Sequence, residues 1–136
     1  MYFALSFSHI NWFAVVVILI LSFALGALWH SVLFKNSWSK DSGSIYNSEN
    51  HGNPAIIFGL SALMHLIAIV GMSVVLKDCD AFQGLLAGLA ISLVWIATSI
   101  GVTYIFVGRT LRLFLIDAGF YVAFLSLAGL ILGAWH

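Results

Sequence analysis

MYFALSFSHINWFAVVVILILSFALGALWH, residues 1–30, contains the apolar run that decides the fold class. The stretch lacks the basic residues that begin a secretory signal peptide, and its run is longer than the usual hydrophobic region of about 7–15 residues. An apolar run of about 18 or more residues is typical of a transmembrane helix. We therefore expect this stretch to be retained as the first membrane span.

The composition of the whole chain also requires lipid as its solvent. Of the 136 residues, 62% are hydrophobic and 7% are charged, and the mean hydropathy is +1.11. A soluble domain of this length needs a charged surface, which five basic and five acidic side chains cannot provide. The net charge is zero and no basic cluster occurs, so the expected partner is the lipid bilayer and not nucleic acid. A single cysteine, Cys79, excludes an internal disulfide.

Four segments are long and apolar enough to span a membrane, which takes about 20 residues each. They are residues 11–34, 55–76, 82–107 and 111–135. The polar stretch at 35–54 is rich in Ser, Asn and Gly and predicts an exposed loop. The other connections are tight turns, so neighbouring helices are expected to be antiparallel. The sequence thus predicts an all-α integral membrane protein, with one four-helix bundle over residues 1–136.

Basic residues are divided unevenly between the two ends of these helices. Lys77 is alone on one side, and four basic residues lie on the other: Lys35, Lys40, Arg109 and Arg112. Basic loops face the cytoplasm, so loops 35–54 and 108–110 are predicted to be cytoplasmic and both termini to lie outside. Aromatic residues near the span ends are expected at the membrane–water interfaces, and these are Trp12, Trp38, Tyr104 and Trp135.

Four short motifs carry a family resemblance. They are NWFAVVV at the start of the first span, GALWHSVLFKNSW at its end, GRTLRLFLIDAGF at the start of the last span and GAW at its end. In this order they resemble the bacterial membrane-protein family filed as domain of unknown function 1761. The resemblance covers nearly the whole chain and implies a four-helix protein of the bacterial cytoplasmic membrane, with no established activity. His30 departs from the expected pattern, in which Tyr follows the Trp.

Asp117 stands in the almost wholly apolar stretch LFLIDAGFY, residues 113–121. It lies roughly 7–8 Å into the last helix, where a carboxylate usually faces protein or water and has a partner. Arg112 is near in sequence, but a spacing of five residues puts the two side chains on different faces; Arg109 precedes the helix and could fold back. His30 lies at nearly the same depth and is the first candidate. An Asp117–His30 contact would be a polar clasp between helices or part of a proton or cation relay; alternatively, Asp117 is wetted at the interface.

His65 lies deeper, about 16 Å beyond Pro54 along the second span. A neutral imidazole is tolerated there if one ring nitrogen finds an acceptor, and Ser61 is one turn away. His65, His30 and Asp117 could together form a relay or bind a metal, although no local ligand motif supports a metal.

Several potential metal ligands collect at the opposite surface without a spacing motif, namely His9, Asp78, Cys79, Asp80 and His136. They are expected to be ordinary surface residues, so we predict no metal and no cofactor.

Small residues form stripes that predict close helix packing. They are Gly26 in the first span, Gly84, Gly88, Ser92 and Ser99 in the third, and Gly119, Gly129 and Gly133 in the last. Asp117 and Gly119 are about 200° apart around their helix, so both opposite faces should contact protein. The last helix is then either central in the bundle or in contact with another subunit, and four short helices favour assembly.

Three function classes follow. The first is a structural or accessory membrane subunit that forms a homo-oligomer or joins a larger complex. The second is a small ion- or proton-coupled transporter or channel that uses Asp117, His30 and His65. An enzyme is not expected, because the sequence contains no catalytic motif.

Overall fold

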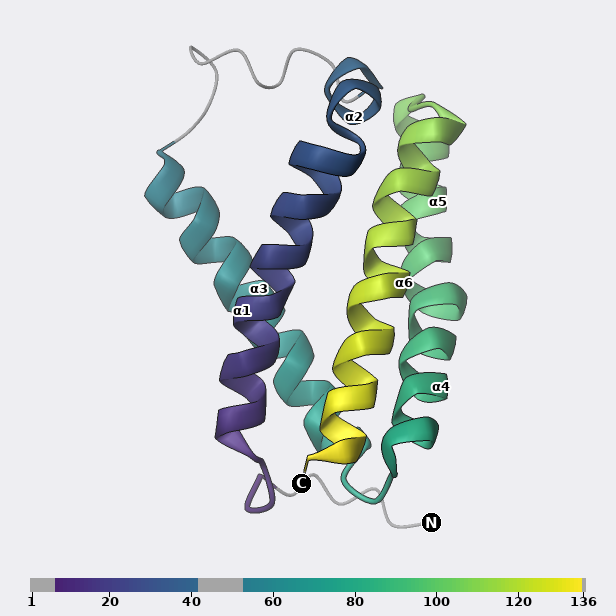
Figure 1. The fold of residues 1–136 in the computed structure, drawn as a ribbon. Coiled ribbons are helices and arrows are strands. Elements are labelled where there is room, and N and C mark those ends of the chain that lie inside the picture. The colour runs from purple at the N-terminus through teal and green to yellow at the C-terminus, as the bar shows by residue number, and fades with distance from the viewer. Residues whose placement is uncertain (1–6, 42–52, 136) are drawn as a thin grey trace.

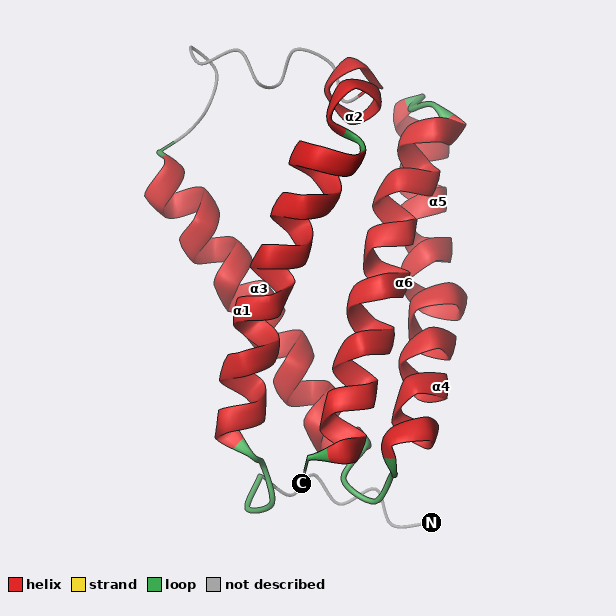
Figure 2. Ribbon diagram, viewed as in Figure 1, coloured by secondary structure: helices red, strands yellow, loops and turns green. Residues whose placement is uncertain are grey.

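The computed structural model describes residues 7–41 and 53–135, and this part of the chain is helical with no strand (Figure 2). Four helices are long and apolar enough to cross a membrane, and each of their bounds lies within one residue of the predicted span. They cover Trp12–Leu33, Pro54–Val75, Ala81–Val107 and Leu111–Ala134. The prediction of an all-α membrane protein is therefore confirmed.

Two of these spans contain a π-helical turn. The first consists of α1 (Trp12–Leu28) followed by η1 (Trp29–Leu33), and the third consists of α4 (Ala81–Ile91), η3 (Ser92–Ile96) and α5 (Ala97–Val107). The second and fourth are the single helices α3 (Pro54–Val75) and α6 (Leu111–Ala134). π-Helical turns inside α-helices are rare, and those that occur are often found at functional sites.

Polar residues fix where the spans begin and end. Asn11, Asn53 and Thr110 each accept a backbone N–H bond of the helix that follows, and Asp80 forms a reciprocal capping box with Gln83. Gly108 ends α5 with φ of 77°, a left-handed conformation that glycine adopts without strain. These local signals leave only two residues, Arg109 and Thr110, between Gly108 and α6.

α6 is the central helix of the bundle. Between 11% and 22% of the most apolar window is buried in the other three spans, whereas the value for α6 is 44%. Its buried side chains include Phe124, Leu125 and Ala128, which belong to the same hydrophobic core as residues of α1 and α3. A central α6 explains why both of its faces contact protein within a single chain.

α4 and α6 pack through glycines at backbone contact. A Cβ added to Gly84 would lie 2.0 Å from the carbonyl oxygen of Gly129, and one added to Gly133 would lie 2.1 Å from that of Asp80. A Cβ at Gly88 would lie 2.0 Å from the carbonyl oxygen of Leu125. The predicted close approach is confirmed, and the glycine stripes of α4 and α6 face each other. They therefore no longer argue for contact with a second subunit.

Three other small residues of the predicted stripes have surroundings of a different kind. Ser92 is fully buried, but Ser99 is exposed and its hydroxyl donates to the carbonyl of Trp95. The prediction that Ser99 packs between helices is wrong within this chain. The π-helical turn η3, which begins at Ser92, rotates Ser99 away from the helix face on which Ser92 is buried. An added Cβ at Gly26 would lie 3.7 Å from the ring of Phe120, which is ordinary contact.

The segment predicted as a polar loop begins with a helix. α2 spans Lys35–Asp41, and the rest of the predicted loop, 42–52, lies outside the described residues. Arg112 of α6 holds the end of α2 with two bonds of 2.6 Å to the carboxylate of Asp41, and Thr110 donates a third at 2.9 Å. The polar composition of this segment concealed a helix because its stability comes from these contacts with α6.

α3 packs closely only along its second half. Its buried residues are Ile69, Met72 and Val74, and none lies in the turns that follow Pro54. In Figure 1, α3 passes behind α1, and its first turns lie well apart from α5 and α6. α3 therefore diverges from α5 and α6 toward the end of the bundle at which α2 lies.

Candidate functional site

The carboxylate of Asp117 accepts hydrogen bonds from three different helical elements. Oδ1 lies 3.2 Å from Nε2 of His30 and 3.1 Å from Nε1 of Trp38, and Oδ2 accepts from the hydroxyl of Tyr104. The side chains of His30 and Asp117 are 23% and 17% exposed. The predicted Asp117–His30 contact is confirmed, and the carboxylate is not wetted alone at the interface.

The π-helical turn η1 places two consecutive aromatic residues against α6. Trp29 donates from Nε1 to the carbonyl of Ile116 at 2.8 Å, and its ring lies 3.1 Å from where a Cβ of Gly119 would be. The next residue, His30, reaches Asp117. Trp29 therefore packs against Gly119 and His30 contacts Asp117, so two consecutive residues of the first span contact two different faces of α6.

Both ring nitrogens of His30 face hydrogen-bond acceptors. Nδ1 lies 3.1 Å from the carbonyl oxygen of Gly26, and Nε2 faces the carboxylate of Asp117. A neutral imidazole donates from one nitrogen only, so both contacts are hydrogen bonds when the ring is an imidazolium. The contact then contains a cation and an anion with no net charge.

His30, His65 and Asp117 line one cavity of about 1110 Å³. Its walls come from α1, α2, α3, α5 and α6, and η1 and η3 contribute further side chains, among them His30 and Ile96. Aromatic and aliphatic side chains form most of the surface, with hydroxyls from Ser22, Ser61, Ser99 and Thr103 among them. The structure thus joins the three predicted intramembrane residues around a shared space, although their direct contact is limited to Asp117 and His30.

His65 is positioned from its own helix and two aromatic rings. Its Nδ1 lies 2.8 Å from the carbonyl oxygen of Ser61, and its ring centroid lies 5.6 Å from Phe23 and 5.2 Å from Phe124. The backbone oxygen accepts, so Nδ1 donates and Nε2 carries the lone pair. Nε2 is buried and has no hydrogen-bond partner within the described structure. Such a nitrogen is an unused acceptor.

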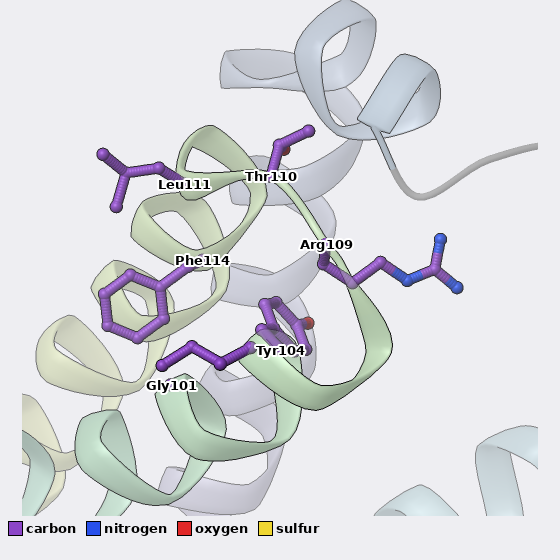
Figure 3. A pocket seen from close by; sticks show the side chains of 7 residues that line it. Gly101, Tyr104, Arg109, Thr110, Leu111 and Phe114 are labelled. Carbon is purple, nitrogen blue, oxygen red and sulfur yellow. The ribbon is translucent and has the colours of Figure 1, made fainter.

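The cationic side chains near Asp117 in sequence do not reach it. Arg112 binds Asp41 instead. That bond, reinforced by Thr110 and Lys40, holds the pKa of Asp41 at about 2, below its ordinary 3.8. Arg109 lines a smaller pocket of about 310 Å³ beside the α5–α6 turn, together with Leu111 and Phe114. Figure 3 shows its side chain pointing away from those two residues. Among the basic side chains that the structure describes, His30 is therefore the one within ion-pair distance of Asp117.

Two partners of Asp117 were not predicted from the sequence. Trp38 and Tyr104 were expected to be interfacial aromatics, and both instead donate to the carboxylate. Tyr104 lies 13 residues before Asp117, across the α5–α6 turn, and this spacing could have indicated a pair at equal depth. Trp38 gave no such signal, because it lies in the segment that was predicted to be a loop.

The weaker metal candidates do not assemble in the described part of the chain. Within residues 7–41 and 53–135, no group of three His, Cys, Asp or Glu side chains is placed to hold one metal ion. Cys79 is partly buried and packs against the core, and His9 is exposed. His136 lies outside the described residues.

Comparison with known proteins agrees with the motifs around this site. The family described as Protein of unknown function (DUF1761) matches residues 13–133, which include Asp117, His30 and His65. The chain belongs to the DUF1761 family. No curated protein and no solved structure matches it. For this DUF1761 protein, the function must therefore be argued from its own site.

Proposed function

We propose that this DUF1761 protein is a small proton-coupled membrane carrier. The observation that supports it is the single cavity shared by Asp117, His30 and His65. Ionisable residues inside a membrane are costly and usually mark a path for protons, ions or substrates. The proposal involves binding and movement across the membrane, with no catalytic step.

Proton coupling would use the Asp117–His30 pair. Gain or loss of one proton switches this pair between net charges of zero and minus one, and the cost of charge in a low-dielectric site makes these two states differ strongly. Trp38 and Tyr104 donate to the carboxylate in both states and keep it in place. We also place loops 35–54 and 108–110 in the cytoplasm, so this pair would lie toward the cytoplasmic side.

Proton flux into liposomes tests the proposal. Purified full-length protein is reconstituted with an internal pH dye, and an inward proton gradient, applied with and without an outward potassium gradient and valinomycin, supplies the driving force. We expect the wild type to admit protons and Asp117→Asn to lose this flux. Asp78→Asn is the matched control, because it removes the same charge from an exposed turn at the other end of the bundle. Equal flux in empty liposomes and wild-type liposomes, with candidate solutes present on both sides, would contradict the carrier.

A second candidate is a structural or accessory subunit that forms oligomers. The first half of α3 favours it, since no residue there is buried within one chain. Ile56, Phe58 and Leu60 are 58%, 62% and 54% exposed in this half. Lipid or a second copy could cover them. Native mass measurement of the detergent-solubilised protein separates these cases, and a monomer would exclude the homo-oligomer.

A further inference from the structure

Most polar groups of the large cavity can offer a ligand an acceptor but not a donor. The hydroxyls of Ser22, Ser61, Ser99 and Thr103 each donate to a carbonyl of their own helix. A hydroxyl has one proton and two lone pairs, so what each can still offer a ligand is a lone pair. The four hydroxyls therefore add acceptors to the wall.

The nitrogen-bearing side chains show the same bias. Nε2 of His65 is a buried lone pair, while the N–H of Trp38 and both N–H groups of His30 have acceptors. The hydroxyl of Tyr104 donates to Asp117. Two lining hydroxyls, Ser31 and Tyr121, make no hydrogen bond with the described residues and can act in either sense. An anion or a carbonyl compound would find few donors in this cavity.

From this arrangement we infer that the cavity binds an organic ammonium ion with an apolar body. An ammonium group brings N–H donors and no acceptor, which is the complement of the wall. Its charge is attracted by Asp117, and Phe23, Phe58 and Phe120 provide ring faces for the apolar body. The inference names the substrate of the proposed carrier and rests on that proposal.

The shape of the bundle admits such a ligand from the bilayer. The cavity reaches Pro54, Ile57 and Phe58 on the first turns of α3, which lie apart from α5 in Figure 1. Amphipathic amines concentrate at the membrane interface, with the charged head in water and the apolar body in lipid. Trp38 of α2 and Pro54 of α3 line the cavity near the end of the bundle, at the depth where the ammonium group would enter.

Binding of the ammonium ion and protonation of His30 would exclude each other. Two positive charges beside one carboxylate repel in a low-dielectric site, so the incoming cation displaces one proton from His30 to water. Neutral His30 still donates from Nδ1 to Gly26, and its Nε2 becomes a further acceptor. The titratable groups that face His30 or share its cavity are Asp117, Tyr104, Tyr121 and His65.

Calorimetry on the full chain in dodecylmaltoside micelles tests the inference with three matched probes. They are 2-phenylethylammonium, its N-trimethyl derivative and 3-phenylpropionate. We expect the first to bind with release of protons, seen as a dependence of the heat on the buffer. The trimethyl derivative should bind about tenfold more weakly because it has no N–H donor, and the carboxylate should not bind.

Variants locate the site within the protein. Asp117→Asn should lower the affinity for 2-phenylethylammonium by at least about tenfold, and Asp78→Asn should leave that affinity unchanged. Equal affinity of the wild type for the ammonium and carboxylate probes would overturn the inference even if Asp117→Asn fails to fold. Proton flux without ammonium binding would overturn this inference alone, whereas ammonium binding without any flux would overturn the carrier and leave the ammonium site in place.

Discussion

Arg112 binds Asp41 and leaves Asp117, five residues later on the same helix, to His30. The guanidinium makes two bonds of 2.6 Å to the carboxylate of Asp41, and Nε2 of His30 lies 3.2 Å from Asp117. The fixed arginine charge is thereby kept at the end of the bundle. The side chain that lines the cavity in its place is a histidine, which has a charged and a neutral form.

The Arg112–Asp41 contact predicts how the docking of α2 depends on pH. Asp41 has a pKa of about 2 in the folded protein and an ordinary value of 3.8. A lowered pKa means that the contact is fully stabilising above pH 3.8 and is lost as the pH falls through about 2. Hydrogen exchange of the backbone amides of 35–41 should show constant protection from pH 7 to 5 and loss of protection between about pH 4 and 2.

The variant Asp41→Asn provides the control for this pH dependence. It removes the titrating group, so the protection of 35–41 should be lower at pH 7 and should not fall further in acid. An unchanged acid-induced loss in Asp41→Asn would assign the effect to another carboxylate.

The three donors around Asp117 predict an energetic coupling with Tyr104. Tyr104→Phe removes one charge-assisted hydrogen bond and should lower the free energy of unfolding by about 0.5–2 kcal/mol. In an Asp117→Asn background the same change should cost clearly less, because the charged acceptor is already absent. Unfolding by SDS in mixed micelles measures both values, and purely additive costs would show that the bond contributes nothing.

Glycines at three kinds of position predict a graded series of alanine variants. Gly84→Ala places a Cβ 2.0 Å from a backbone oxygen and should lower the free energy of unfolding by more than about 2 kcal/mol. Gly119→Ala meets the ring of Trp29 at 3.1 Å and should cost less, because a ring can shift. Gly59→Ala meets nothing within 4 Å and should be neutral or stabilising by up to about 1 kcal/mol.

SDS titration of the three purified variants ranks them on one scale. A Gly84→Ala protein as stable as Gly59→Ala would contradict the backbone contact between α4 and α6. Gly59 is a suitable control because it lies on the exposed first half of α3.

The spans and the His30–Asp117 contact could be predicted because both depend on distance along the membrane normal. Hydropathy gives the ends of each helix, and counting residues from those ends gives the depth of a polar side chain. Depth does not give azimuth, and so the sequence did not distinguish a central α6 from one at a subunit interface. The glycine stripes showed the same limit, since they predicted close contact but not that Gly84 would face Gly129.

The contribution of α2 could not be predicted from local sequence. Six of its seven residues are polar, and seven residues are too few to form a stable helix alone. Its Trp38 and Asp41 bind partners more than 70 residues away in the sequence. Tertiary contacts of this kind leave no periodic signal. For the same reason the large cavity was not foreseen, because it depends on how far α3 diverges from α5.

The π-helical turn η1 has a consequence for the tolerance of the site to changes in chain length. The amide of Phe34 bonds to the carbonyl of Trp29, five residues back, so the turn contains one residue more than an α-helical turn does. Because the bulge absorbs this extra residue, deleting one residue from the turn would restore an α-helix and leave the helix on either side in nearly its present orientation. The side chains inside the turn would be re-spaced instead, and they include Trp29 and His30, which contact Ile116 and Asp117. The geometry of the site thus depends on the number of residues in this turn as well as on their chemistry.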